Sequence, residues 1–268
     1  MNIKRLIKKY FFSLFSTTYF QPIFTSMHRV SLWGMNIGLG SDVESSGEIY
    51  ALRKFAKGIS SGESPVVFDV GANIGDFATS VHRIFRGNCI IHCFEPSSSA
   101  CRILERKFKD WKNINIHKMA LGNHTGEATL FLDKEASGCA SLYKRKDFDI
   151  RITETVSVCT LDEFCDRNNI PHINYLKLDV EGHELYVLQG GERILYNGGV
   201  DWIQFEFGGC NIDSRTFFRD FYEILSRDYV IYRLLRNGFS EIRQYHETQE
   251  IFTTTNFLAV RENLLRKV

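Results

Sequence analysis

Residues 66–77 read VVFDVGANIGDF, an apolar run that an acid and two glycines then interrupt. The run from Val66 to Val70 has the length of a buried β-strand, and the glycines after it predict a tight turn into a helix that begins near Ile74. A strand, a turn and a helix in this order start an α/β unit. The question is whether this first turn only joins two elements or also binds a ligand.

The alternation of apolar runs and helical patterns continues along the chain. Strands are expected at residues 66–70, 89–94, 114–119, 175–180, 200–207, 229–235 and 256–261, and helices from 74, from 97, over 183–195 and over 214–225. Buried strands separated by helices predict a parallel sheet with right-handed crossovers, a doubly wound α/β domain. The last strand is expected to be antiparallel, at or near the sheet edge. Residues 133–154 lack periodicity and are expected to form a surface loop or lid.

The first 60 residues are expected to form an N-terminal helical extension to a domain that spans residues 61–268. Its first segment predicts a basic amphipathic helix, and a second helix is expected over residues 46–57. The cations of the first helix are Lys4, Arg5, Lys8 and Lys9. Polar residues interrupt the uncharged segment that follows, so we expect neither a membrane-spanning helix nor a secretory signal. The basic helix fits weak contact with an anionic membrane surface, although packing on the domain or on a second subunit of a homo-oligomer is favoured.

Composition narrows the function and the compartment. The chain has 33 basic and 32 acidic side chains, so no overall positive field attracts nucleic acid, and a nucleic-acid partner is not expected. Its seven cysteines include no C-x-x-C pair, which disfavours a zinc site or a disulfide framework. We therefore expect a cytoplasmic protein, with a peripheral position at the inner membrane face as the alternative.

The first turn has the features of a ligand site. Gly71 and Gly75 would let the backbone approach a ligand where a Cβ would collide. A dinucleotide site requires G-x-G-x-x-G, but this chain has D-x-G-x-x-x-G, and Asp69 places an anion where a pyrophosphate would lie. This pattern disfavours a nicotinamide-dependent oxidoreductase and suits a cationic ligand. Glu95, 20 residues after Gly75, ends the second strand, where it can accept both hydroxyls of a ribose. Together these features predict a site for S-adenosylmethionine.

Six motifs then point to a family. FDVGANIGDF, HCFEP, MALGNHTGEATLF, VCTLDEF, YLKLDVEGHELYVLQGG and IQFEF follow in this order between Phe68 and Phe207, and in combination they resemble the FkbM family of S-adenosylmethionine-dependent methyltransferases. The resemblance implies a class I methyltransferase (Rossmann-like) fold, with seven strands of which the last is antiparallel. It also implies O-methylation of a hydroxyl of a sugar, glycan precursor or related natural product.

The resemblance assigns cofactor residues by position. The methionine side of the pocket would be formed by Asp69, Gly71, Asn73 and Gly75, and Glu95 would hold the ribose. Ala120, Leu121 and Gly122, after the third strand, would lie near the adenine.

An acidic cluster at the ends of the fourth and fifth strands is the expected catalytic site, because an aliphatic hydroxyl needs a general base or a metal ion to become a nucleophile. In one mechanism Asp179 or Glu181 is the base, with His183 as a helper, and Lys177 orients a carboxylate or the acceptor. In the other, Asp179, Glu181 and Glu206 hold a hard cation such as Mg²⁺. A third role, complementing the charge of the next helix, explains Glu184 and fits Glu181 as well.

The sequence thus predicts a methyltransferase with a small-molecule or glycan acceptor, active in polysaccharide or natural-product biosynthesis. The alternative is a non-catalytic cofactor-binding partner in a biosynthetic assembly. The intact acids at the ends of the fourth and fifth strands argue against that alternative.

Overall fold

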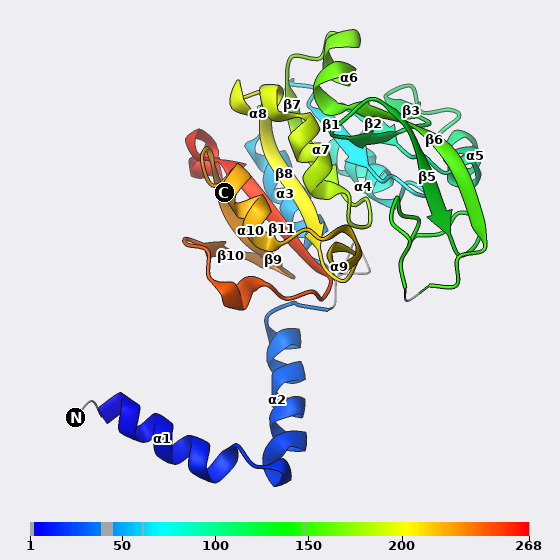
Figure 1. Cartoon of the computed structure of the whole chain (residues 1–268). Helices are drawn as coiled ribbons and strands as arrows, with labels where there is room; N and C mark the ends of the chain where they lie inside the picture. Colours follow the sequence, from blue (N-terminus) through cyan, green and yellow to red (C-terminus); the bar gives the residue numbers. More distant parts are fainter. Residues whose placement is uncertain (1–2, 39–44, 61, 147, 268) are drawn as a thin grey trace.

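A central sheet of eight strands organises the protein, and its order is β10-β9-β11-β8-β7-β1-β2-β3 (Figure 1). The computed structural model describes residues 3–38, 45–60, 62–146 and 148–267. The strands are β1 (Val66–Val70), β2 (Ile90–Phe94), β3 (Ile114–His117), β7 (Ile173–Leu178), β8 (Val200–Phe207), β9 (Tyr229–Leu235), β10 (Gly238–Ile242) and β11 (Thr255–Arg261). Strands β3, β2, β1, β7 and β8 are parallel, whereas β11 is antiparallel to both β8 and β9. The predicted doubly wound sheet with an antiparallel last strand, as in class I methyltransferases, is confirmed.

One strand exceeds the seven that were expected. Strand β10 pairs antiparallel with β9 at the edge of the sheet, directly after a short turn. Its sequence, GFSEI, is short and half polar, because an edge strand need not be buried on both faces. It therefore lacks the apolar run that marked the other strands.

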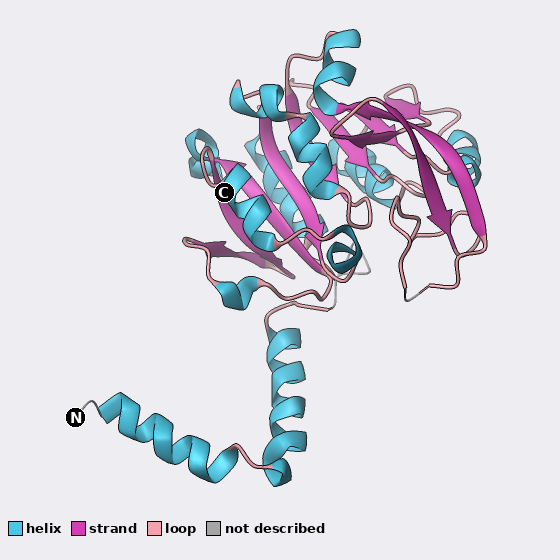
Figure 2. Ribbon diagram, in the orientation of Figure 1, coloured by secondary structure: helices cyan, strands magenta, loops and turns pink. Residues whose placement is uncertain are grey.

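Helices cover both faces of the sheet (Figure 2). Helices α3 (Glu48–Gly58), α4 (Asp76–Phe85) and α5 (Ser98–Lys107) contribute to one apolar core, which includes Val67, Tyr175 and Trp202 of the sheet. Helices α6 (Leu161–Arg167), α7 (Glu184–Gly190), α8 (Glu192–Tyr196) and α10 (Phe218–Leu225) contribute to the other. Alternate residues of each strand thus face different cores, as the pleat of a strand requires.

Two predicted helices are divided. The helix expected over residues 183–195 is interrupted at Gly191, where an added Cβ would lie 2.6 Å from Leu161 Cδ2. The helix expected over residues 214–225 begins only at Phe218, after the separate α9 (Cys210–Ser214) and a left-handed Arg215 with φ of 60°. The first break coincides with the pair Gly190-Gly191, and the second follows a residue in the left-handed conformation.

A second, three-stranded sheet was not predicted. It has the order β4-β6-β5, from β4 (Ala120–Gly122), β5 (Gly126–Leu132) and β6 (Ile152–Thr160). The stretch expected to be a loop, 133–154, therefore ends in strand β6. Before β6, Ser141 pairs with Phe131 of β5, so this segment is tied to the small sheet.

The first helices stand away from the domain (Figure 1). The predicted basic helix is confirmed as α1 (Ile3–Phe15), and a 3₁₀ turn, η1 (Thr18–Phe20), leads into α2 (Gln21–Gly34). Helix α3 packs on the sheet, and the domain boundary at residue 60 stays a prediction. Short 3₁₀ turns η2 (Glu247–Gln249) and η3 (Glu262–Lys267) flank β11. Within the described ranges, every helix is too short or too polar to cross a bilayer.

Candidate active site at the carboxyl ends of the strands

Two adjoining cavities lie where strands β1, β2, β7 and β8 end. The first, here called the Glu95 cavity, is bordered by Glu95, Ala120 and Leu121. The second, the Lys177 cavity, is bordered by Lys177 and Glu206. Residues that border both are Gly71, Asn73, Gly138, Asp179 and Glu181. The fold therefore brings most of the predicted cofactor and catalytic residues to one place.

The glycines of the first turn are required by the protein itself. Gly71 and Gly75 have φ of 85° and 80°, a conformation that residues with a Cβ rarely adopt. An added Cβ on Gly71 would lie 1.8 Å from Asp179 O, and one on Gly75 would lie 2.5 Å from the Phe108 ring. Neighbouring protein atoms alone thus require glycine at both positions, and the expected close approach of a ligand stays a prediction. Asn73, between them, has φ of 45°, which is strained for a residue that is not glycine.

Asp69 is fully buried within β1. Neither of its carboxylate oxygens has a hydrogen-bond partner among the described residues. Burial raises its pKa to about 6, although the ammonium of Lys177 opposes that shift. A buried acid without a partner is costly to keep, and this one borders the Lys177 cavity.

Glu95 is held in place by backbone N–H groups. Its Oε2 accepts a hydrogen bond from Asn73 N at 2.8 Å, and its Oε1 accepts one from Ser97 N at 2.8 Å. Burial raises the pKa of Glu95 to about 7. Because each carboxylate oxygen has a further lone pair, Glu95 can still accept from a bound ligand.

Only two of the three residues expected near the adenine border the Glu95 cavity. Ala120 and Leu121 border the Glu95 cavity. Gly122 instead packs against His183, because an added Cβ would lie 2.8 Å from His183 Nε2.

A buried polar network supports the Lys177 cavity. Lys177 Nζ lies 2.8 Å from Asp179 Oδ2 and 4.0 Å from Glu48 Oε1. Gln204 Nε2 donates to Glu48 Oε1 at 2.5 Å, and Tyr175 OH donates to Gln204 Oε1 at 2.6 Å. Burial opposes the charge of Lys177, but the neighbouring carboxylates raise its pKa above the ordinary value. Lys177 therefore stays charged and balances several acids.

Glu48 was not predicted as a site residue. It lies in the first turn of α3, on the same helix face as the buried Ala51, Leu52 and Phe55. An acid at the first position of an i, i+3, i+4, i+7 apolar stripe is unusual, because burying it requires a partner. That pattern was the available signal, and the partners are Lys177 and Gln204.

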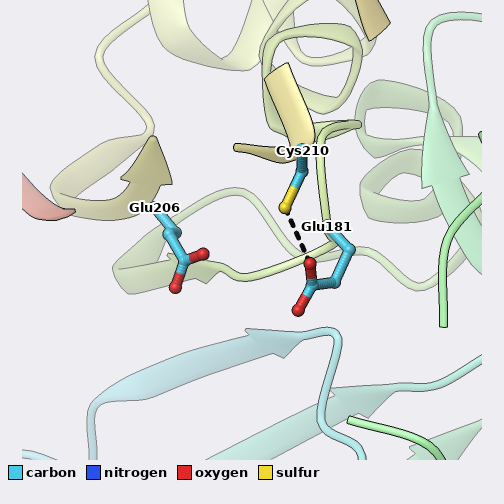
Figure 3. A group of neighbouring side chains, drawn as sticks. All are labelled: Glu181, Glu206 and Cys210. Atoms are coloured by element: carbon cyan, nitrogen blue, oxygen red, sulfur yellow. Dashed lines mark hydrogen bonds between the residues drawn. The ribbon is translucent and has the colours of Figure 1, made fainter. Parts of the chain in front are cut away.

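Glu181 is the centre of a second set of contacts (Figure 3). Arg145 Nη1 lies 2.7 Å from Glu181 Oε2, and Cys210 Sγ donates to the same oxygen at 2.7 Å. Glu181 has φ of 53°, the left-handed region, so its backbone is strained. Arg145 comes from the irregular segment after β5, and nothing in the local sequence indicated that it would reach this cluster.

The cluster fits a hard cation poorly. One ligand atom each from Glu181, Glu206 and Cys210 lie within 4.8 Å of one another, whereas Asp179 pairs with Lys177. Burial and the adjacent Glu181 raise the pKa of the Cys210 thiol, so it stays protonated. Magnesium prefers oxygen ligands. The ammonium group of Lys177 already balances the charge of Asp179, and the guanidinium group of Arg145 balances that of Glu181. Magnesium binding by Asp179, Glu181 and Glu206 stays a prediction.

His183 borders the Glu95 cavity, and Glu184 lies in the first turn of α7. His183 Nδ1 lies 2.9 Å from Tyr143 OH, and its ring stacks on Tyr186 with the ring centres 4.9 Å apart. Burial lowers the pKa of His183 to about 4, which makes it a weak base at neutral pH. Glu184 Oε1 accepts from Val180 N at 2.9 Å and from Gly182 N at 3.1 Å. Glu184 therefore closes the turn before α7, whereas its expected role of complementing the charge of that helix stays a prediction.

Comparison with known proteins gives one family match. The family described as "Methyltransferase FkbM domain" matches residues 69–245, well over half of the chain. Hexuronic acid methyltransferase AglP of Haloferax volcanii is 29% identical over 129 residues, which are 48% of this chain and 50% of that protein. Methyltransferase 1 of Beauveria bassiana is 26% identical over 143 residues, 46% of this chain and 57% of that protein. The chain thus spans about half the length of the curated relatives it matches.

Solved structures of similar fold include other methyltransferases. The FkbM methyltransferase from Methylobacillus flagellatus is 18% identical with a TM-score of 0.44, over 73% of this chain and 43% of that one. Fibrillarin of Aeropyrum pernix, solved with S-adenosylmethionine, is 14% identical with a TM-score of 0.41, over 79% and 76%.

Proposed function

This chain belongs to the FkbM family of methyltransferases, and from that premise we propose that it transfers the methyl group of S-adenosylmethionine to a hydroxyl of a sugar or related molecule. One observation carries the proposal. The Glu95 cavity and the Lys177 cavity meet at Asp179 and Glu181. A cofactor in the first cavity would therefore present its methyl group to an acceptor in the second.

The Glu95 cavity suits the nucleoside of the cofactor. Glu95 would accept the two ribose hydroxyls through its remaining lone pairs, and Ala120 and Leu121 would contact the adenine. The methionine portion would extend toward Asp69 and Asp179, whose negative charge suits the sulfonium and ammonium groups.

Asp179 is our candidate for the general base. Its side chain is 38% exposed, against 15% for that of Glu181, and only one of its oxygens is bound by Lys177. The acceptor oxygen would attack the methyl carbon in line with the sulfur. The new C–O bond forms as the S–C bond breaks, the hydroxyl proton passes to Asp179, and S-adenosylhomocysteine leaves. Lys177 holds Asp179 in position, and alignment of the reactants lowers the barrier further.

The acceptor class rests on similarity. One curated relative, which this chain matches over half of that protein's length, is named a hexuronic acid methyltransferase. That name favours a sugar hydroxyl as the acceptor of this chain. A non-catalytic cofactor-binding partner is the competing function. It predicts normal cofactor affinity with no methyl transfer to any sugar acceptor.

Glu95→Gln should weaken binding of S-adenosylhomocysteine by about 10- to 100-fold, because hydrogen bonds to a charged acceptor contribute about 1.5–3 kcal/mol. Titration calorimetry at one pH measures the change. Glu105→Gln, the same substitution at an exposed position on α5, should leave the affinity unchanged. Equal affinities for Glu95→Gln and the unmodified protein would remove Glu95 from the ribose site.

NAD should not bind the unmodified protein, and binding of NAD alone would overturn the proposed function.

Methyl transfer should continue in metal-free buffer that contains a chelator. The physical reason is that Lys177 and Arg145 already balance the charges of Asp179 and Glu181. Initial rates with and without the chelator test this expectation. A rate that disappears with the chelator and returns on adding Mg²⁺ would favour the metal mechanism instead.

A further inference from the structure

The segment from α1 to α2, residues 3–34, forms an arm that stands away from the domain (Figures 1 and 2). Many of its large apolar side chains are exposed. Ile7 is 64% exposed, Leu14 is 63% exposed and Val30 is 61% exposed. Neither η1 nor α2 contains a buried residue. A folded protein seldom leaves so many large apolar side chains in water on one segment unless they have a partner.

The two helices of the arm contact each other through aromatic rings. Phe11 and Phe15 of α1 have ring centres 6.1 Å and 6.3 Å from that of Phe24 in α2, and Phe20 packs on Phe15 at 5.2 Å. These contacts hold the bend between the helices. A neighbouring strip of large apolar side chains on α1 stays largely exposed: Ile3 (75%), Ile7 (64%), Tyr10 (62%) and Leu14 (63%).

The charge of the arm indicates which kind of partner covers its exposed apolar side chains. No Asp or Glu precedes Asp42, whereas Lys4, Arg5, Lys8, Lys9 and Arg29 lie in this segment. A second copy of the arm would place cations against cations with no acid to balance them. An anionic lipid surface offers both an apolar layer and negative headgroups.

We propose that the α1–α2 arm binds the surface of an anionic lipid bilayer. Helix α1 lies in the interface, with Ile7 and Leu14 among the acyl chains and with Lys8 and Lys9 at the headgroups. At 13 residues it is too short to span the bilayer, so it rests on one face.

The arm joins the domain beside the Lys177 cavity. After α2, Asn36 Nδ2 donates to Leu234 O at 3.2 Å, and Gly38 N donates to Thr254 O at 2.9 Å. Thr254 borders the Lys177 cavity. A bound arm would therefore keep this edge of the sheet near the lipid surface. This placement favours an acceptor presented at the membrane, a consequence that rests on the proposed function, whereas lipid binding itself does not.

Vesicle co-sedimentation of the full chain tests lipid binding without any need for catalysis. The protein should sediment with vesicles of phosphatidylcholine containing about one third phosphatidylglycerol, and much less with phosphatidylcholine alone. Binding should weaken as salt is added, because salt screens the lysines. Lys8→Gln with Lys9→Gln should weaken it by about 30-fold, since each cation near the surface contributes on the order of fivefold.

Ile7→Asp with Leu14→Asp should abolish sedimentation with either vesicle. Tyr196→Asp, at an 82% exposed position on α8, should have no effect on lipid binding. Thermal melting should be unchanged in the arm variants, because these side chains do not contact the domain core. The proposal is overturned if the unmodified protein fails to bind or binds both vesicles equally. The proposal is also overturned if the protein is a dimer that does not bind lipid vesicles and if the double substitution Ile7→Asp with Leu14→Asp dissociates that dimer.

Discussion

Asp179→Asn should lower kcat for methyl transfer by about 10²- to 10⁴-fold, the usual contribution of a general base. Asparagine keeps the shape of the side chain but cannot take up the hydroxyl proton. Because Asp179 also borders the Glu95 cavity, the affinity for S-adenosylhomocysteine must be measured in parallel, and it should change by less than about tenfold. A fall in kcat with the affinity largely retained would assign Asp179 to the chemical step.

Asp76→Asn is the matched control. Asp76 borders the Lys177 cavity, as Asp179 does, but not the Glu95 cavity. Its side chain is 65% exposed, and it pairs with Lys107 Nζ at 2.8 Å. It carries the same charge as Asp179 but is not placed at the border of the two cavities. Its substitution should change kcat by less than about tenfold. If Asp179→Asn and Asp76→Asn have equal kcat, Asp179 is not the base.

Lys177→Met should lower the free energy of unfolding by about 3–5 kcal/mol, the usual cost of removing one partner of a buried charge pair. Lys177 is 5% exposed and is the ammonium beside Glu48, Asp69 and Asp179. Without it, the buried carboxylates repel one another. Urea unfolding monitored by circular dichroism measures the change. Lys109→Met, whose side chain is 73% exposed, should stay within about 0.5 kcal/mol of the unmodified protein.

The effect of Lys177→Met should depend on pH with a definite sign. Lys177 lowers the pKa of Glu48 and Asp69 in the folded state, in opposition to burial. Without the ammonium, those groups hold their protons to higher pH in the folded state than in the unfolded state. Stability of the variant therefore falls as pH rises. The difference from the unmodified protein should be smaller at pH 5 than at pH 8, and adding Glu48→Gln should restore part of the stability. A small loss that is equal at both pH values would show that Lys177 does not balance these acids.

The sheet was largely predictable because its strands are rich in apolar residues. The apolar runs at β1, β8 and β9 matched the strands residue for residue. β1 and β8 are almost wholly buried, whereas β9 mixes buried and partly buried residues but is still mostly apolar. The edge strand β10 and the small sheet containing β5 and β6 escaped prediction, because half-exposed strands mix polar and apolar residues. The break in the helix after β7 falls at Gly190-Gly191, a glycine pair that was a local signal for a turn and that the sequence analysis did not use.

The residues of the candidate site likewise fall into those that the sequence indicated and those that it did not. Glu95 and Asp179 were found from the general rule that ligands bind beyond the carboxyl ends of parallel strands. Glu48 and Arg145 were missed because they reach the site from α3 and from an irregular segment, through contacts distant in sequence. The structure adds a second reason for the glycines of the first turn. Gly71 is required by the approach of Asp179 O, while the neighbouring Glu95 and Asp69 are the side chains suited to a ligand.

A crystal structure of this protein with S-adenosylhomocysteine would show whether the cofactor binds in the Glu95 cavity. We expect the ribose hydroxyls to lie within hydrogen-bond distance of Glu95 and the adenine to lie beside Ala120 and Leu121. We expect the sulfur to point toward Asp179, where the two cavities meet. A ligand bound elsewhere, or bound with its sulfur directed away from the Lys177 cavity, would contradict this expectation.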